Sequence, residues 1–149
     1  QVLGVFEAAL VSPIAEVLRN LGTDHAMVVH GTDGLDEVTL GGPTHVAEVT
    51  ADRIQLYEIR PEDFGVEEGS IDELRVSSAE ESAEIIRGVL DGRKGPARDI
   101  VLVNSAAAVY VGGAAGSIAE AVDKAAESID GGAAAKVLNL LVERTNAPG

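Results

Sequence analysis

Two Ser-x-x-Glu strings, each followed by apolar residues at helical spacing, constrain the fold of this chain more than any other feature. Ser78 stands three residues before Glu81, and Ser117 stands three residues before Glu120. In such a capping box, the serine hydroxyl and the glutamate carboxylate accept hydrogen bonds from the free amides at a helix N-terminus. The sequence therefore predicts two helices that begin directly after these serines.

Four amphipathic helices are expected, each with one apolar face that packs against the rest of the fold. The helix after Ser78, which closes at Gly92, has this face on Ala79, Ala83, Ile86 and Leu90. The helix after Ser117, which closes at Gly131, has it on Ile118, Ala121, Val122, Ala125, Ala126 and Ile129. A helix capped by Ser12, with Pro13 at its first position, has it on Ile14, Val17, Leu18 and Leu21. A last helix from Ala133 to Arg144 has it on Val137, Leu138, Leu141 and Val142.

Strands are expected in the first half of the chain. Residues 26–29 are a short apolar run, which is typical of a strand buried on both faces. Residues 46–50 and 54–59 alternate around a tight turn at Ala51-Asp52, and this pattern predicts a hairpin. Residues 61–70 are rich in acids and glycine, and we expect a loop there.

The segment 98–111 fits either a strand or a helix, because it combines β-branched residues with many alanines. Its length favours a helix, and we interpret it as one. The order of the elements then predicts an α/β fold with a mixed or parallel sheet and flanking helices. Three or four strands form a small sheet for a fold with so many predicted helices.

Composition excludes several classes of function. The chain of 149 residues has 25 acidic and 11 basic side chains, a net charge of −14, so it would repel a phosphate backbone and is not a general nucleic-acid binder. It has no cysteine, which excludes disulfides and thiolate metal sites and fits a reducing, cytoplasmic location. The uncharged segment 100–119 is too polar and too rich in alanine and glycine for a membrane span.

The densest polar cluster follows the apolar run 26–29 directly and reads His-Gly-Thr-Asp-Gly-Leu-Asp-Glu over residues 30–37. In open α/β sheets, ligands bind beyond the carboxyl ends of the strands, so acids there are well placed for function. Adjacent Asp36 and Glu37 offer the hard oxygen ligands that Mg²⁺ prefers. The alternative is structural, with Asp33-Gly34 as a turn and the acidic pair capping or decorating the next element. Residue chemistry alone leaves both interpretations open.

Other candidate motifs are weaker. His25, His30 and His45 lack the spacing of a zinc site, so we interpret each as a surface or packing residue. The glycines between residues 112 and 116 do not follow the dinucleotide-binding pattern, and we expect a connector. The acids of residues 33–37 also lack the spacing of a calcium-binding loop.

Several blocks of the sequence stand together in an order specific to one enzyme family. They read QVLGVFEAALVSPIAEVLRNLG, VVHGTDGLDEVTL, GPTHVAEV, YEIRPEDFG and IIRGVLDGRKGPARDIVLVNSAAAVYV. Together they resemble anthranilate phosphoribosyltransferase of tryptophan biosynthesis, from Gln1 to about Val142. Asn104 of the Leu-x-Asn block matches the family, whereas Ser82 replaces its usual Asn, which affects only local helix packing.

The resemblance implies that residues 1–149 are the C-terminal part of the large α/β domain of the nucleoside phosphorylase/phosphoribosyltransferase fold. The N-terminal helical domain, the pyrophosphate loop and the anthranilate-orienting Arg of the family have no counterpart in this chain. The family transfers phosphoribosyl from phosphoribosyl pyrophosphate to anthranilate and releases pyrophosphate. Its magnesium-binding acidic pair matches Asp36 and Glu37, so the resemblance implies Mg²⁺ as the cofactor.

The resemblance also implies a cytoplasmic homodimer when the enzyme is complete, and a chain that is inactive alone. We further expect the isolated chain to expose a sheet edge and apolar helix faces, and to be unstable or to aggregate. A non-catalytic scaffold or regulatory domain that keeps only the fold is the alternative. A relative of pyrimidine-nucleoside phosphorylases fits these blocks less well.

Overall fold

The computed structural model describes residues 1–147 and has one four-stranded sheet. The strands are β1 (Val2–Gly4), β2 (His25–Gly31), β3 (Thr44–Thr50) and β4 (Ile54–Ile59), and they lie in this order across the sheet. β1 is parallel to β2, whereas β3 is antiparallel to both of its neighbours. The mixed sheet and the β3–β4 hairpin are confirmed. β1 was missed because three residues are too few to show a pattern.

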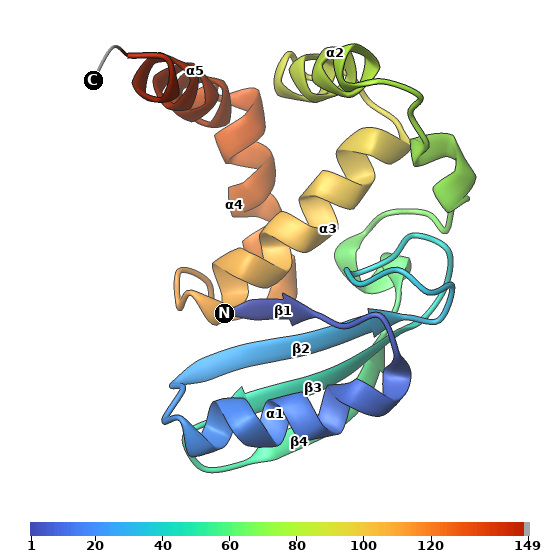
Figure 1. The fold of residues 1–149 in the computed structure, drawn as a ribbon, viewed down its shortest axis with the longest axis vertical. Helices are drawn as coiled ribbons and strands as arrows, with labels where there is room; N and C mark the ends of the chain where they lie inside the picture. The colour runs from blue at the N-terminus through green and yellow to red at the C-terminus, as the bar shows by residue number, and fades with distance from the viewer. Residues whose placement is uncertain (148–149) are drawn as a thin grey trace.

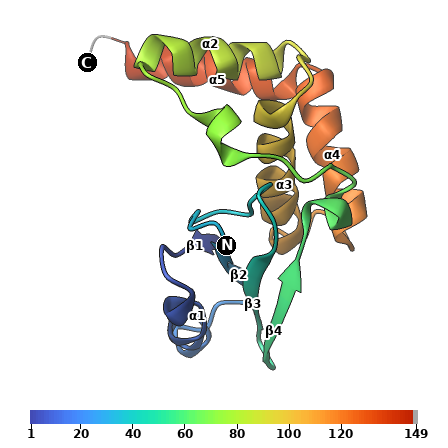
Figure 2. The same ribbon diagram turned by 90° about the vertical axis from the view of Figure 1, so that its right-hand side faces the viewer.

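Strand β2 is buried on both faces, as its apolar run predicts. Ala26 and Val28 belong to the core beneath helix α1 (Val11–Asn20). Met27 and Val29 belong to the core on the opposite face, with residues of helix α3 (Pro96–Val111). The sheet therefore separates α1 from the remaining helices (Figures 1 and 2).

Helix α1 differs from the expectation in its start and in its buried face. It begins at Val11, after a 3-10 turn at Ala8–Leu10, and Ser12 does not cap it. The face on the sheet consists of Val11, Ala15 and Leu18. Val17 and Leu21 are exposed, which contradicts the predicted apolar face. The reason is rotation: the row of residues 11, 15 and 18 faces the sheet, and residue 17 is turned about 100° from residue 18.

The two serine caps are confirmed. Helix α2 (Ala79–Leu90) begins after Ser78, whose Oγ accepts a hydrogen bond from the Glu81 amide at 3.1 Å. Helix α4 (Ile118–Asp130) begins after Ser117, whose Oγ accepts one from the Glu120 amide at 3.2 Å. α4 buries the expected face through Ala121, Ala125 and Ile129.

The segment 98–111 is helical within α3, as interpreted from its length. The glycines after it form the connector to α4 and include Gly113 in the left-handed region, at φ 71°.

Residues 61–70, expected as a loop, contain a short 3-10 helix at Pro61–Phe64. A second 3-10 helix, η3, follows at Ile71–Leu74. Among residues 1–147, we find no helix with the length and apolarity that a membrane crossing requires.

The outer helices correct two further expectations. α5 (Ala133–Thr145) has no buried residue within the described chain, and its predicted inner residues Val137, Leu141 and Val142 are exposed. In α2, Ile86 is 48% exposed, and the buried residues are Gly88 and Val89. Both helices lie at the end of the molecule far from the sheet (Figure 2). Helical periodicity correctly marks an apolar face, but it does not say whether this chain itself covers that face.

Candidate metal-binding loop

The loop between β2 and β3, residues 32–43, leaves the sheet at the carboxyl end of β2. β1 is parallel to β2, and Gly4 at the end of β1 pairs with Val29 near the end of β2. The carboxyl ends of the two parallel strands therefore meet at the edge of the sheet that carries the loop. This is the position at which open α/β sheets bind ligands.

The Asp33 carboxylate stabilises the loop through hydrogen bonds to two other loop residues. Its Oδ2 accepts a hydrogen bond from the Thr39 hydroxyl, and its Oδ1 accepts one from the Leu35 amide at 3.2 Å. The Gly34 amide donates to the Gly31 carbonyl at 2.8 Å, with Gly34 in the left-handed region at φ 96°. Asp33-Gly34 thus forms the turn that the structural interpretation predicted, and Asp33 is occupied by contacts within the loop.

Asp36 and Glu37 lie at the exposed part of the same loop. The next regular element after them is strand β3, so neither caps a helix. Their main chain passes directly over β1: a Cβ at Gly4 would lie only 1.5 Å from the Asp36 carbonyl oxygen. The two side chains are therefore adjacent, accessible carboxylates at the carboxyl edge of the sheet.

Helix α3 holds the loop immediately after the acidic pair. The Val38 amide donates to Asn104 Oδ1 at 2.9 Å, and Asn104 Nδ2 donates to the Val38 carbonyl at 2.9 Å. The family blocks include Asn104, but no spacing in the sequence connects it with the loop. Gly4 and Asn104 are the site residues that residue chemistry missed, because their partners are distant in the sequence.

Two adjacent carboxylates fit only part of a metal site. Within residues 1–147, no group of three or more His, Cys, Asp or Glu side chains is arranged to hold a metal ion. Mg²⁺ is usually bound in proteins through one or two carboxylates together with substrate phosphates and water. The pair thus fits Mg²⁺ that arrives with a phosphorylated substrate.

The polar contacts of the three histidines are with residues other than Asp36 and Glu37. His30 is buried, and its Nδ1 donates to the Val5 carbonyl at 2.8 Å. His45 stacks on the His30 ring at a centroid distance of 6.4 Å, and its Nδ1 lies 3.3 Å from Glu58 Oε1. These contacts between neighbouring strands agree with a packing role.

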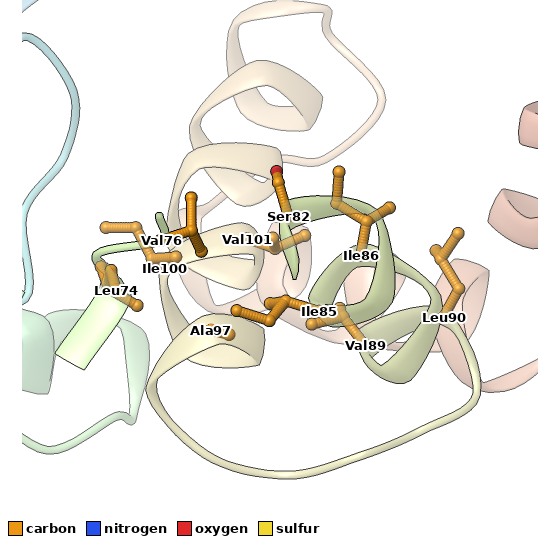
Figure 3. A pocket seen from close by; sticks show the side chains of 10 residues that line it. All are labelled: Leu74, Val76, Ser82, Ile85, Ile86, Val89, Leu90, Ala97, Ile100 and Val101. Carbon is orange, nitrogen blue, oxygen red and sulfur yellow. The ribbon is translucent and has the colours of Figure 1, made fainter. Parts of the chain in front are cut away.

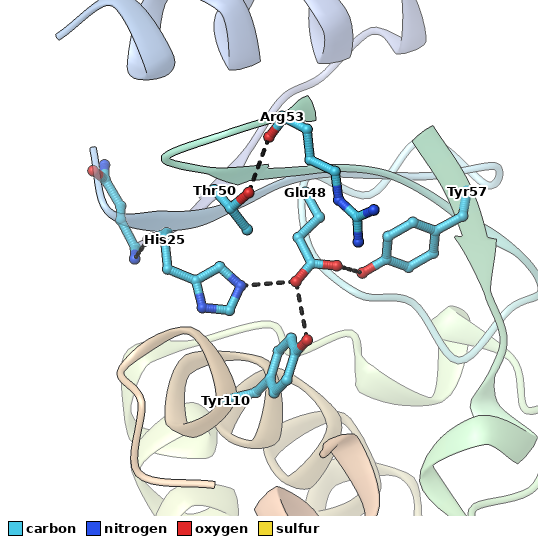
Figure 4. Close-up of polar contacts among 7 residues, drawn as sticks. His25, Glu48, Thr50, Arg53, Tyr57 and Tyr110 are labelled. Atoms are coloured by element: carbon cyan, nitrogen blue, oxygen red, sulfur yellow. Dashed lines mark hydrogen bonds and ion pairs between the residues drawn. The ribbon is translucent and has the colours of Figure 1, made fainter. Parts of the chain in front are cut away.

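A second polar cluster, missed by sequence reasoning, surrounds Glu48 on β3 (Figure 4). Its carboxylate accepts hydrogen bonds from His25 Nε2 at 2.8 Å, Tyr57 OH at 2.8 Å and Tyr110 OH at 3.0 Å. Burial raises the pKa of Glu48, but these hydrogen bonds outweigh it, and the pKa lies below its ordinary value. Burial and the Glu48 carboxylate both raise the pKa of Tyr110. The cluster lies at the start of β2, so it joins α3 to the sheet away from the β2–β3 loop.

An apolar groove lies between η3, α2 and α3 (Figure 3). It is lined by Leu74, Val76, Ser82, Ile85, Ile86, Val89, Leu90, Ala97, Ile100 and Val101. The Ser82 hydroxyl is the one polar side-chain group among these lining residues, so the groove offers packing surface and no acid–base chemistry. Ser82, the departure from the family blocks, thus lies in a packing environment as expected.

Residues 1–135 match the model of the glycosyl transferase family, a/b domain. The chain belongs to this family. Over 146 residues it is 48% identical to an anthranilate phosphoribosyltransferase of Nitrosomonas europaea, an alignment that covers 98% of this chain. It spans 43% of that relative, so it corresponds to less than half of the curated protein.

Solved structures give the same relationship for the fold. The crystal structure of anthranilate phosphoribosyltransferase from Thermus thermophilus matches 97% of this chain with a TM-score of 0.86 and 34% identity, over 42% of that protein. The Saccharomyces cerevisiae enzyme in complex with PRPP and Mg matches 93% of this chain with a TM-score of 0.83 and 27% identity, over 40% of that protein. The resemblance and the α/β fold expected from the sequence are thus confirmed.

Proposed function

We propose that this chain is the C-terminal α/β portion of an anthranilate phosphoribosyltransferase, in which Asp36 and Glu37 bind Mg²⁺. The observation that carries the proposal is the exposed acidic pair at the carboxyl ends of two parallel strands. The relatives at 48% identity and the PRPP and Mg complex of a structural neighbour support it. The reaction would transfer phosphoribosyl from phosphoribosyl pyrophosphate to anthranilate, as a step of tryptophan biosynthesis.

The role of the pair follows from its charge. Two adjacent carboxylates repel each other and repel a pyrophosphate, so they favour phosphate binding only with a cation between them. When bound, Mg²⁺ neutralises charge that develops on the departing pyrophosphate. Asp36 and Glu37 would supply oxygen ligands from a loop whose main chain is already held, so little ordering is needed when the cation binds.

The proposal assigns the remaining chemistry to parts of the enzyme outside this chain. On this proposal, the pyrophosphate loop, the residues that orient anthranilate and the helical domain for dimerisation lie in the part of the enzyme outside residues 1–149. We expect the chain alone to be inactive, and the complete enzyme to act as a homodimer in the cytoplasm.

The test replaces the acidic pair in the complete enzyme that contains this chain. Asp36→Asn with Glu37→Gln should lower Mg²⁺-dependent turnover by about 100-fold or more, because several kcal/mol of charge stabilisation are lost. The measurement is the steady-state rate at varied Mg²⁺, with the fold checked by thermal unfolding. The matched control is Glu67→Gln with Glu68→Gln, an equally adjacent and exposed acidic pair.

Two outcomes would contradict the proposal. Unchanged turnover in the Asp36 and Glu37 double variant would remove the pair from the reaction. Absence of phosphoribosyl transfer in the unmodified complete enzyme, with the fold intact, would favour the scaffold alternative.

A further inference from the structure

The hydrogen bonds of the β2–β3 loop flank the acidic pair. Before the pair, Leu35 is held twice: its carbonyl accepts from the Gly31 amide at 2.7 Å, and its amide donates to Asp33 Oδ1 at 3.2 Å. Asp36 and Glu37 follow immediately. The main chain on the N-terminal side of Asp36 is thus held in place at Leu35.

After the pair, Val38 is fixed as well, and by a single side chain from another part of the sequence. Asn104 accepts from the Val38 amide and donates to its carbonyl, both at 2.9 Å, across 66 positions. Asn104 Nδ2 also donates to the Ile100 carbonyl of its own helix at 3.0 Å. Both ends of the side-chain amide are used, and this determines its orientation.

The Val38 side chain strengthens this anchor. It is 1% exposed and belongs to the same core as Val29 of β2 and Val103 of α3. Without Asn104, the Val38 amide and carbonyl would lose their hydrogen-bond partners in a partly buried setting, which is unfavourable for both groups. The main chain would then be driven to move toward water, and Glu37 would move with it.

We propose that Asn104 is a positioning residue for the acidic pair: by fixing the main chain of Val38, it sets where Asp36 and Glu37 present their carboxylates. In this role Asn104 acts through the main chain of Val38. The inference rests on the proposed function and deepens it, since it names the residue on α3 that controls the geometry of the ligands. Residues that orient metal ligands typically affect metal affinity by about 10- to 100-fold when replaced.

The test uses the complete enzyme carrying Asn104→Ala and measures two things: direct Mg²⁺ binding, by isothermal titration calorimetry with phosphoribosyl pyrophosphate and without anthranilate, and the Mg²⁺ dependence of turnover. We expect the apparent affinity for Mg²⁺, in the presence of phosphoribosyl pyrophosphate, to fall about 10- to 100-fold. The KM for anthranilate should change by less than about 3-fold. A general loss of structure would lower the activity at every concentration of Mg²⁺, so saturating Mg²⁺ should restore most of kcat only if Asn104 acts by position.

The matched control is Tyr110→Phe. It removes a polar contact of α3 with strand β3, Tyr110 OH to Glu48 Oε1 at 3.0 Å, away from the acidic pair. This variant should lose stability but keep the Mg²⁺ dependence of the unmodified enzyme. If Asn104→Ala does not fold, Asn104→Asp is used, because it retains the acceptor for the Val38 amide.

The outcomes separate the two proposals. If the Asp36 and Glu37 double variant loses turnover while Asn104→Ala and Tyr110→Phe behave alike toward Mg²⁺, the proposed function stands and the positioning role of Asn104 is overturned. If the acidic double variant keeps its turnover, the proposed function itself fails, and this inference fails with it. Selective loss of Mg²⁺ affinity in Asn104→Ala supports both.

Discussion

Gly4 allows the main chain of the β2–β3 loop to approach strand β1 closely. The Asp36 carbonyl oxygen occupies the space that a side chain would need, at 1.5 Å from a Cβ built on Gly4. We expect Gly4→Ala to destabilise the protein by about 1–3 kcal/mol, as overpacking does, and to weaken Mg²⁺ binding by displacing the loop. Thermal unfolding and a Mg²⁺ titration of the complete enzyme measure both effects.

A suitable control is Gly69→Ala. A Cβ at Gly69 meets nothing within 4 Å, so the substitution should change neither stability nor Mg²⁺ affinity appreciably. Equal behaviour of the two alanine variants would show that the close approach of Asp36 to β1 has no bearing on the loop.

Residue chemistry predicted part of this site. The turn at Asp33-Gly34 follows from the preference of Asp and Gly for turns. The candidate ligands Asp36 and Glu37 follow from their position after an apolar strand, and their role stays a prediction. Gly4 and Asn104 were out of reach because their significance depends on contacts with residues 36 and 38, which only the folded chain creates.

At the scale of elements, α3 and α4 are joined by an ion pair with one buried partner. Arg98 is 3% exposed, and its Nη2 donates to Asp130 Oδ2 at 3.0 Å. Nη1 lies 3.0 Å from Asp130 Oδ1 without a hydrogen bond, so the pair combines one hydrogen bond with a second charge contact. Removing the carboxylate would leave the guanidinium buried without its counter-charge.

We therefore expect Asp130→Asn to lower the free energy of unfolding by about 1–3 kcal/mol. The effect is limited to this range because the Asp130 side chain is half exposed and solvent screens part of its charge. The measurement is the midpoint of thermal or urea unfolding. Asp123→Asn, an exposed acid on the same helix, is the control. A shift of equal size in both variants would show that only the net charge of α4 matters.

The Glu48 cluster couples α3 to the sheet in a pH-dependent way. Burial raises the pKa of Glu48, the hydrogen bonds from His25, Tyr57 and Tyr110 lower it, and the result lies below the ordinary value. A carboxyl group with a depressed pKa stabilises the fold above its unfolded pKa and loses that contribution as the pH falls through its folded pKa.

The expected result is that Glu48→Gln lowers the free energy of unfolding near neutral pH by about 1–3 kcal/mol. The difference from the unmodified protein should shrink below about pH 4.5. Unfolding curves between about pH 7 and pH 3 measure it. A difference for Glu48→Gln that is constant with pH would contradict the expectation.

Elements with a local signal were predicted well. The serine caps correctly predicted the starts of α2 and α4, and the alternation of apolar and polar residues correctly predicted β3 and β4. Both signals depend only on residues that are close in the sequence. The start of α1 was wrong because it is set by a preceding 3-10 turn and by packing on the sheet. The inward faces of α2 and α5 were wrong because burial depends on what lies beyond the helix.

For the whole molecule, the decisive feature is the apolar surface of α5. Val137 is 65% exposed and Leu141 is 57% exposed, beside the groove that α5 forms with α2. Apolar patches of this kind on a separate chain favour association. The chain of residues 1–149 by itself should therefore elute as assemblies in size-exclusion chromatography and melt with poor cooperativity.

Val137→Glu with Leu141→Lys should reduce that association, because it replaces two exposed apolar side chains with charged ones. The two new charges are one helical turn apart and can pair, which preserves the helix. The control is Glu127→Gln with Asp123→Asn, which changes charge on an exposed part of α4. A compact monomer with a cooperative melt for the unmodified chain would contradict the expectation.

The contact between Val38 and Asn104 also determines when the acidic loop acquires its final shape. Its partners are 66 positions apart, whereas the β3–β4 hairpin is closed by residues 51–53 alone. Closing a long segment costs more chain entropy than closing a short one, so the hairpin is expected to form early and the Val38 anchor late. On a ribosome, the loop would leave the exit tunnel long before residue 104 is available to hold it. The proposed cation site at residues 36 and 37 would then take its final shape only once α3 has packed against the loop.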